Sequence, residues 1–428
     1  MSTRRPSRTA TSAVPAHSQP TLLAADLTLS FADLGVPATL CRALVASGID
    51  HPFPVQSATL PATLAGRDVL GRGRTGSGKT LAFALPLVTR LAGTKSESKR
   101  PRGLVLAPTR ELAAQIEQVI KPLAAVGKMT VTTVFGGVSP AKQIAALRAG
   151  VDIVVACPGR LEDLISSGHV SLADVQVTVL DEADHMADLG FLPAVRRLLD
   201  QTPAGGQRML FSATLDAGVG QLVRRYLVDP VERGVDTPTT PVAPADHQIL
   251  QITIEQRLEV LVGLVSGTDR CIVFTRTKHR AKTLARQLVH AGCATVELHG
   301  NLAQPRRVAN LAAFSTGKAT VLVATDIAAR GIHVDDVTLV IHADPPIEHK
   351  AYLHRSGRTA RAGAAGQVIT LMTSEQAPAL AKLVKAAGLR PQITQHVSAA
   401  GQPATPTRVT PSRNVPAVAG AGWERPAG

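Results

Sequence analysis

The sequence has few aromatic residues, few cysteines and no long apolar run. Aromatic residues make up 3% of the 428 positions, so base stacking on an aromatic platform is a poor expectation for ligand binding. The four cysteines lie far apart without a C-x-x-C pair, which favours reduced thiols over disulfides or a metal site. No apolar run reaches membrane-spanning length, and residues 1–20 lack the apolar core of a signal peptide. These absences predict a cytoplasmic protein without a membrane partner.

Positive charge, by contrast, is abundant. The formal net charge is +14, and most of it lies in the body of the chain rather than at its ends. A basic folded body favours a polyanionic partner, nucleic acid first. Because aromatic residues are scarce, contacts to the sugar-phosphate backbone fit better than contacts to bases. Charge alone leaves open the alternative of a basic protein that is merely soluble.

Length and pattern predict two α/β domains with parallel sheets. A chain of 428 residues exceeds one ordinary core. Short apolar runs alternate with helical patterns from residue 68 onward, and the alternation restarts after a proline-rich stretch, which is typical of repeated β–α units. We therefore divide the chain into a basic disordered tail (1–20), a first domain (21–234), a linker (235–244), a second domain (245–391) and a disordered tail (392–428).

Distinctive residues follow the ends of the expected strands. Open α/β sheets bind ligands at the carboxyl ends of their strands, so we expect one binding edge in the first domain. The strands are expected at 68–71, 104–107, 130–135, 152–156, 177–180 and 209–211, and in the second domain at 247–254, 271–275, 295–298, 320–324, 337–341 and 367–370. The segments after the first-domain strands are 73–80, 108–110, 136–137, 158–160, 181–184 and 212–214.

Two of these segments predict a nucleotide site. Residues 73–80 read GRTGSGKT, a full G-x-x-x-x-G-K-T phosphate loop. Backbone N–H groups of such a loop, its Lys79 and the start of the following helix bind phosphates. After the apolar run 177–180 come Asp181 and Glu182. We expect Thr80 and Asp181 to hold Mg²⁺, directly or through water, and Glu182 to orient an attacking water.

With these motifs in place, the sequence resembles the DEAD-box ATP-dependent RNA helicases from about Phe31 to Gln376, in the family's motif order. The resemblance implies two tandem RecA-like domains that bind ATP and Mg²⁺ between them. It assigns adenine reading to Phe31 and to the segment 52–56 that ends in Gln56. The residues that it implies for nucleotide binding are Gln56, Thr75, Gly76, Ser77, Gly78, Lys79, Thr80 and Gly331.

The resemblance also implies an RNA surface and a coupling segment. RNA contacts fall on Pro108, Thr109, Arg110, Gly137, Gly159 and Arg160 in the first domain and on Arg276, Gln304, Arg307 and Thr325 in the second. Ser212, Thr214 and His354 correspond to residues that couple the two ligands. Arg358 and Arg361 would face the γ-phosphate from the second domain and complete a catalytic set with Lys79, Asp181 and Glu182.

Three residues depart from the family pattern. Ile49 stands where an aromatic residue usually meets the adenine, which places more of the selectivity on Gln56. Cys157 replaces a threonine whose hydroxyl could bind an RNA phosphate. His333 replaces an aspartate that helps to hold the ribose in relatives, and Asp335 is a candidate to compensate. None of the three belongs to the expected hydrolytic residues.

The expected function is RNA-stimulated ATP hydrolysis, giving ADP and phosphate, with local unwinding or remodelling of RNA or ribonucleoproteins and little sequence preference. An ATP-gated RNA clamp needs the same residues and stays open as an alternative. A DNA translocase is disfavoured by the tetrad 181–184 together with Gln56. Histidines gather in the second domain without metal-ligand spacing, so we expect network or surface roles rather than zinc binding; they are His299, His333, His342, His349 and His354.

Overall fold

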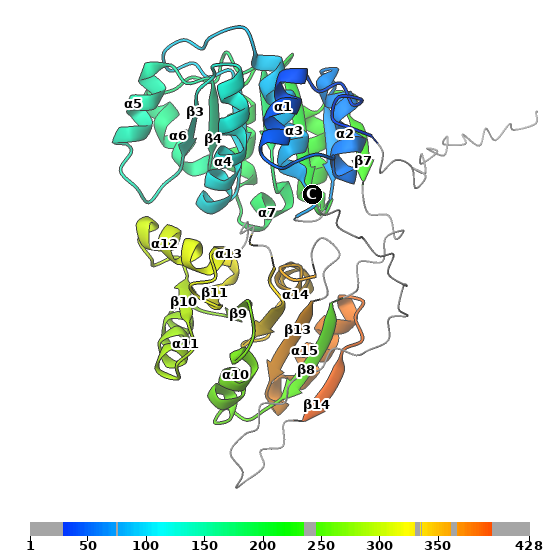
Figure 1. The fold of residues 1–428 in the computed structure, drawn as a ribbon, viewed down its shortest axis with the longest axis vertical. Helices are drawn as coiled ribbons and strands as arrows, with labels where there is room; N and C mark the ends of the chain where they lie inside the picture. Colours follow the sequence, from blue (N-terminus) through cyan, green and yellow to red (C-terminus); the bar gives the residue numbers. More distant parts are fainter. Residues whose placement is uncertain are drawn as a thin grey trace, which may run out of the picture.

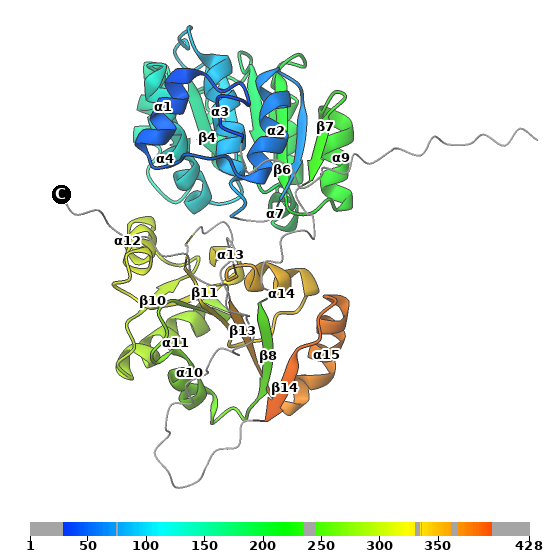
Figure 2. The same cartoon turned by 45° about the vertical axis from the view of Figure 1, so that its right-hand side comes forward.

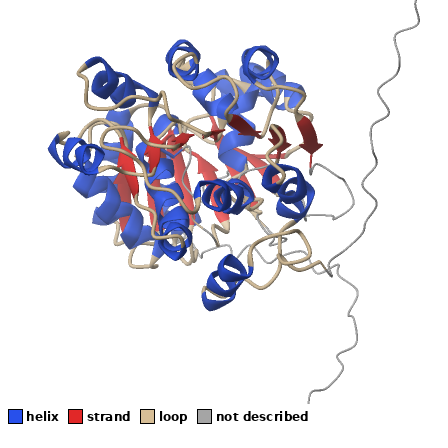
Figure 3. Cartoon of the chain, turned by 90° about the horizontal axis from the view of Figure 1, so that it is seen from above, coloured by secondary structure: helices blue, strands red, loops and turns tan. Residues whose placement is uncertain are grey.

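A computed structural model describes residues 29–73, 76–234, 245–329, 334, 336–360 and 366–395. Two α/β domains lie one above the other, each built on a seven-stranded sheet (Figures 1 and 2). All strand pairs in both sheets are parallel, as expected. Seen from above, helices flank the strands on both sides (Figure 3). The predicted linker, 235–244, and the tail 1–20 fall outside the described residues.

The first sheet has the strand order β3-β4-β2-β5-β6-β1-β7. Its central strands are buried along their whole length, and β2, β4 and β5 are nearly continuous apolar runs, as is typical of strands covered on both faces. The strands are β1 (Val69–Arg72), β2 (Gly103–Leu106), β3 (Val131–Val134), β4 (Ile153–Ala156), β5 (Val177–Leu180), β6 (Gln207–Ser212) and β7 (Val231–Gly234).

Nine helices cover the two faces of this sheet in the described part of the first domain, α1–α4 on one core and α5–α9 on the other. Side-chain caps fix two of their starts: Thr109 accepts from the backbone of Leu112, and Asp216 accepts from that of Val219. The helices are α1 (Ala38–Ala46), α2 (Pro54–Leu64), α3 (Lys79–Leu91), α4 (Arg110–Val126), α5 (Ala141–Ala149), α6 (Pro158–Ser166), α7 (Ala183–Asp188), α8 (Leu192–Leu199) and α9 (Ala217–Tyr226).

The second sheet repeats the plan of the first. Its order, β10-β11-β9-β12-β13-β8-β14, is the order of the first sheet when each is counted from its own first strand. The strands are β8 (Asp246–Gln251), β9 (Cys271–Thr275), β10 (Thr295–Leu298), β11 (Val321–Thr325), β12 (Leu339–His342), β13 (Gln367–Met372) and β14 (Gln392–Gln395). The helices are α10 (Arg257–Val265), α11 (Lys278–His290), α12 (Gln304–Ser315), α13 (Asp326–Ala329), α14 (His349–Ser356) and α15 (Ala377–Ala386), with a 3₁₀ turn at Ser374–Gln376.

The strands differ from expectation mainly at the edges. Every expected strand is present within a few residues, but β7 and β14 were not predicted. The expected tail from residue 392 is wrong for its first four residues, because β14 there pairs with β8. Both missed strands are short, polar and at a sheet edge, so neither shows the continuous apolar run of an inner strand. No helix in the described residues is long and apolar enough to cross a membrane.

Candidate active site between the two domains

The lysine of the phosphate loop donates a hydrogen bond to the first residue of the same loop. Gly76 and Gly78 have φ of 87° and 88°, the left-handed region that favours glycine, and α3 begins directly after them. Lys79 is buried, and its Nζ donates to the carbonyl of Gly73 at 2.7 Å. The Oγ of Ser77 is buried without a hydrogen-bond partner among the described residues. An orphaned hydroxyl beside a buried ammonium suits a bound phosphate oxygen. Thr75 falls outside the described residues.

Gln56 ties helix α2 to the phosphate loop. Its Oε1 accepts from the backbone of Phe53 at 2.8 Å, and its Nε2 donates to the carbonyl of Gly78 at 2.9 Å. The side chain is fully buried. A Cβ at Gly78 would lie 2.6 Å from this Nε2, so only glycine fits there. Gln56 therefore couples the segment that precedes α2 to the position of the loop. Ile49 packs against the hydrophobic core of the same domain.

Asp181 and Glu182 stand side by side after β5, as the sequence predicts. Asp181 is buried, and its Oδ1 accepts from the backbone of Glu182 at 3.0 Å. Burial raises the pKa of Asp181 to about 7; the charge of Lys79 lowers it, and that of Glu182 raises it. Burial disfavours the ionised form of this carboxyl group, and a cation bound beside it would stabilise that form. Asp181, with the half-buried Thr80 of α3, therefore has the chemistry of a Mg²⁺ ligand set.

Glu182 has a histidine as its immediate partner. The Nδ1 of His185, one helical turn along α7, lies 3.1 Å from Oε2 of Glu182, and both side chains are buried. Burial raises the pKa of the Glu182 carboxyl. The hydrogen bond and charge of His185, with the charges of Arg358 and Lys79, lower it by more, so the net effect is a lowered pKa. The net lowering of the pKa favours the ionised form of Glu182. Arg358 belongs to the second domain, so its effect crosses the domain gap.

The last aspartate of the tetrad is bonded to the predicted coupling segment. Both the backbone N–H and the hydroxyl of Thr214 donate to Oδ2 of Asp184, at 2.9 and 3.0 Å. The backbone of Asp184 donates to Oγ of Ser212, which donates in turn to the carbonyl of Thr214. The third predicted coupling residue, His354, is not in this network. It lies across the gap, with Nδ1 3.9 Å from a carboxylate oxygen of Asp188.

The second domain reaches the first through helix α14 and the residues after it. Lys350 on α14 lies 3.5 Å from Asp216 at the start of α9. Arg358 is buried. Arg355 makes a bidentate ion pair with Asp326 and lies over the ring of Phe274, which holds α14 against its own domain. Gly331 and Arg361 lie outside the described residues.

Three of the predicted RNA-binding residues form hydrogen bonds between the two domains. Gln304 and Arg307 of α12 both donate to Oε1 of the buried Glu111, at 3.0 and 2.7 Å. Arg110 donates to the amide oxygen of Gln304 at 3.3 Å. Glu111 belongs to the segment 108–113 that the resemblance assigns to RNA contacts, but sequence spacing does not predict its bonds to α12. These contacts tie α4 to α12.

The remaining predicted RNA-binding residues are divided between the two domains, and Gly137 lies against Arg110. Gly137 has a φ of 75°, and a Cβ there would collide with the guanidinium of Arg110. Gly159, in the first turn of α6, has open space where a Cβ would be. Arg160 donates to the carbonyl of Val138 at 3.2 Å. The others take up turns, caps and strand ends: Pro108 is buried, Thr109 caps α4, Thr325 ends β11, and the backbone of Arg276 donates to Asp344.

Cys157 directly precedes α6. Burial raises the pKa of its thiol to about 12, so it stays protonated. Its place before Pro158 puts a thiol, a weak donor, where the family pattern has a hydroxyl. His333 and Asp335 fall outside the described residues.

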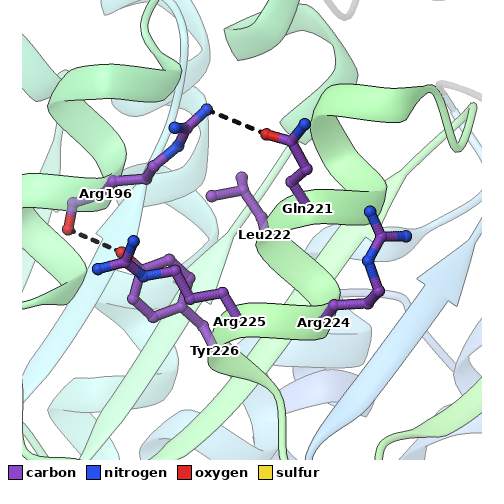
Figure 4. A pocket seen from close by; sticks show the side chains of 6 residues that line it. All are labelled: Arg196, Gln221, Leu222, Arg224, Arg225 and Tyr226. Atoms are coloured by element: carbon purple, nitrogen blue, oxygen red, sulfur yellow. Dashed lines mark hydrogen bonds between the residues drawn. The ribbon is translucent and has the colours of Figure 1, made fainter.

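A separate hollow of about 310 Å³ lies between α8 and α9 of the first domain (Figure 4). Arg196 donates there to the amide of Gln221 at 3.4 Å, and Arg225 lies over the ring of Tyr226. None of the predicted site residues lines it, so this surface is distinct from the strand-end site.

Comparison with known proteins agrees with this arrangement. The family model described as DEAD/DEAH box helicase matches residues 53–222, and the helicase conserved C-terminal domain matches residues 254–363. The ATP-dependent RNA helicase RhlB of Sodalis glossinidius is 39% identical over 359 residues, which are 81% of this chain and 86% of that protein. The chloroplastic DEAD-box ATP-dependent RNA helicase 3B of Zea mays is 42% identical over 358 residues, 81% of this chain and 48% of that protein. The chain spans about half the length of several curated relatives, the maize protein among them.

The structure of S. cerevisiae Dbp5 bound to RNA and ADP BeF3 matches with a TM-score of 0.74 at 27% identity, covering 86% of this chain and 95% of that one. The expected architecture of two tandem RecA-like parallel-sheet domains is therefore confirmed. Two family models in sequence, a relative matched over most of its length and the ordered motifs lead to one conclusion: the chain belongs to the DEAD-box family of ATP-dependent RNA helicases.

Proposed function

We propose that this chain is an ATP-dependent RNA helicase that hydrolyses ATP to ADP and phosphate and locally unwinds or remodels RNA or ribonucleoproteins. One observation carries the proposal: Arg358 is buried just after α14, the second-domain helix that meets the first domain at Asp216 and Asp188, and its charge helps to lower the pKa of the buried Glu182. A cation facing the carboxylates from the opposite domain is what a split phosphoryl-transfer site needs, because such chemistry depends on positioning and charge neutralisation.

The first domain binds the nucleotide in this proposal. The phosphates are held by the loop residues Gly76, Ser77, Gly78 and Lys79, with Thr75 as a further contact. Gln56 fixes the position of this loop relative to the segment that binds the adenine. Asp181 and Thr80 would hold Mg²⁺, which supplies charge neutralisation at the phosphate oxygens when bound. Glu182 orients the attacking water and accepts its proton. Gly331 is proposed as a nucleotide contact of the second domain.

The second domain completes the site when it closes. Arg358, and Arg361 by the same reasoning, supply planar guanidinium groups for the charge that develops on the transferred phosphoryl group. Ser212 and Thr214, bonded to Asp184, connect this chemistry to the RNA side. His354 lies 3.9 Å from Asp188 of the first domain, so closure brings α14 against α7.

RNA is proposed to lie across both domains near the Glu111–Gln304–Arg307 cluster. Open space at Gly159 in the first turn of α6 lets a phosphate approach backbone N–H groups, and Arg160 stands beside it. Pro108, Thr109, Arg110, Gly137, Arg276 and Thr325 complete the proposed surface. Because such contacts address sugar and phosphate, base preference is small. RNA that favours closure must tighten ATP binding, and ATP must tighten RNA binding by the same factor.

The test is ATP turnover by the full chain with and without single-stranded RNA at low salt. We expect strong stimulation by RNA and much weaker stimulation by DNA of the same sequence. Equal stimulation by DNA would favour a DNA translocase, and no stimulation by RNA would overturn the proposal. A strand-displacement assay distinguishes the clamp alternative, which predicts ATP-dependent RNA binding without displacement.

The same proposal covers the domain bounds and the location. Residues 21–234 and 245–391, extended by β14, act as the two moving units, and 235–244 acts as their linker. A cytoplasmic location stays a proposal, since the named relatives include chloroplastic proteins.

A further inference from the structure

Helix α7 presents a histidine to the carboxylate proposed to orient the attacking water. His185 lies one turn after Glu182, and its side chain is 6% exposed. Its Nδ1 is 3.1 Å from Oε2 of Glu182. Its Nε2 is buried without a hydrogen-bond partner among the described residues. Within the described part of the chain the ring has one hydrogen bond, and that bond goes to Glu182.

The direction of this hydrogen bond follows from the charges. The Oε2 of Glu182 lies 3.1 Å from the ring nitrogen and accepts the hydrogen bond, since a carboxylate group has no hydrogen to donate. The Nδ1 of His185 therefore carries a hydrogen, whether the ring is neutral or protonated. The bond is of the charge-assisted kind, which is stronger and more directional than a bond between neutral groups.

His185 supports the carboxylate at a point where the backbone is unusual. Glu182 has a φ of 51°, in the left-handed region, and precedes α7 as its N-cap residue. His185 acts on Glu182 through a side-chain hydrogen bond, whereas Arg358 and Lys79 act on it through their charges. The histidine engages Oε2, so Oε1 is the oxygen that can face a water molecule.

We infer that His185 is a positioning residue for ATP hydrolysis: by donating to Oε2, it fixes the rotamer of Glu182 so that Oε1 faces the attacking water. This inference rests on the proposed function, in which Glu182 orients that water. His185 does not touch nucleotide or metal in this account. Its effect belongs to the chemical step and not to ATP binding or domain closure.

Two substitutions separate positioning from space filling. His185→Leu keeps an apolar side chain of similar size and removes the donor. His185→Asn keeps an N–H donor near the place of Nδ1. We expect His185→Leu to lower the kcat of RNA-stimulated hydrolysis about 10-fold, the effect of losing one hydrogen bond to a charged group. KM for ATP and ATP-dependent RNA binding stay at their unaltered values, and His185→Asn recovers kcat to within about threefold.

The opposite outcomes overturn the inference. Equal losses in kcat for Leu and Asn, or a loss that appears in KM and in RNA binding, would show a structural role for α7. Unchanged kcat in His185→Leu would show that Glu182 needs no such partner. Glu182→Gln, assayed alongside, is expected to bind ATP and lose hydrolysis. If Glu182→Gln turned over normally, the proposed role of Glu182 would fail, whatever the His185 variants did.

Discussion

The two domains share one strand order but carry different residues at the ends of equivalent strands. After β1 comes the phosphate loop, and α3 starts with Lys79; after β8 there is no such loop, and α10 starts with Arg257. After β5 comes Asp181, and after the equivalent β12 comes Asp344, one residue further from the strand end. A lysine and an aspartate in the first domain thus correspond in position to an arginine and an aspartate in the second.

In the second domain, the aspartate at this position forms ion pairs with arginines of the same domain. Asp344 accepts from Arg257 at 3.1 Å, lies 3.0 Å from the guanidinium of Arg280 and accepts from the backbone of Arg276. Its negative charge is already neutralised, so it has no need of a metal. At Asp181, burial outweighs the charge of Lys79 and raises the pKa of the carboxyl to about 7. Two domains with the same strand order therefore differ in function, because the residues that bind ligands lie in the loops after the strands and not in the sheet.

The largest expected effect tests whether the second domain contributes to the first domain's site. Arg358→Ala should lower kcat about 10³-fold or more while ATP affinity changes little, because arginine contacts of this kind act on the developing charge. Steady-state ATPase assays and nucleotide titration measure the two quantities. Arg358→Lys serves as a matched control and should stay impaired, since lysine lacks the planar fork. A normal kcat for Arg358→Ala would show that the first domain acts alone.

The next effect compares the two equivalent basic positions. Lys79→Ala should weaken ATP binding on the order of 100-fold, as expected from losing an ammonium that contacts phosphates. Arg257→Ala should leave ATP affinity unchanged, because it only removes one partner of Asp344. Titration with a fluorescent ATP analogue would give both affinities. Matching losses in the two variants would contradict the view that only the first domain binds nucleotide.

A buried and an exposed ion pair between the two domains should differ in how much each contributes to ATP-dependent RNA affinity. Glu111→Ala leaves Arg307 and Gln304 without the buried acceptor that joins the two domains, so ATP-dependent RNA affinity should fall about 10-fold. Asp216→Asn keeps an acceptor for the cap of α9 but removes the charge that faces the more exposed Lys350, and it should change that affinity by less than about threefold. RNA titrations with a non-hydrolysable ATP analogue test both. A larger effect at Asp216 would reverse the assignment.

The smallest expected effect is a pH dependence confined to the second domain. Burial, with the charges of Arg355 and His247, holds the pKa of His342 well below its ordinary value of 6.5. Unfolded chains take up this proton near pH 6.5 and the folded domain does not, so stability is full above 6.5 and falls as pH drops below it. The loss reaches at most about 1.4 kcal/mol per pH unit.

Chemical denaturation between about pH 7.5 and 5 measures this slope. His342→Gln should flatten it, although the variant also loses the contact of the ring nitrogen Nδ1 with Thr370. The exposed His279 of α11 gives the control, because His279→Gln should leave the slope as it is. An unaltered slope in His342→Gln would place the titrating group elsewhere.

Much of this architecture could be predicted because buried parallel strands and phosphate loops leave strong local signals. The run 177–180 and the two carboxylates after it identify both a central strand and its chemical end. The edge strands β7 and β14 could not be recognised, since Val231–Gly234 and Gln392–Gln395 have a mostly polar pattern that also suits a loop. The six-residue α7 is too short to show helical periodicity.

The partners of the site residues were harder to foresee. Glu111, His185 and Asp216 acquire their roles from contacts made only when distant elements meet, such as the 2.7 Å bond from Arg307 to Glu111. Sequence spacing could place His185 on the same helical turn as Glu182, but not decide that its ring turns toward the carboxylate. Likewise, Gln56 could be linked to the nucleotide side, whereas its two bonds to Phe53 and Gly78 needed the fold.

One structure determination tests the split site most directly: the full chain with Mg²⁺, a non-hydrolysable ATP analogue and single-stranded RNA. If the second domain completes the site, the guanidinium of Arg358 will lie within about 3 Å of a terminal phosphoryl oxygen, with Glu182 on the opposite side of that phosphorus. An Arg358 side chain directed away from the nucleotide in that complex would contradict it.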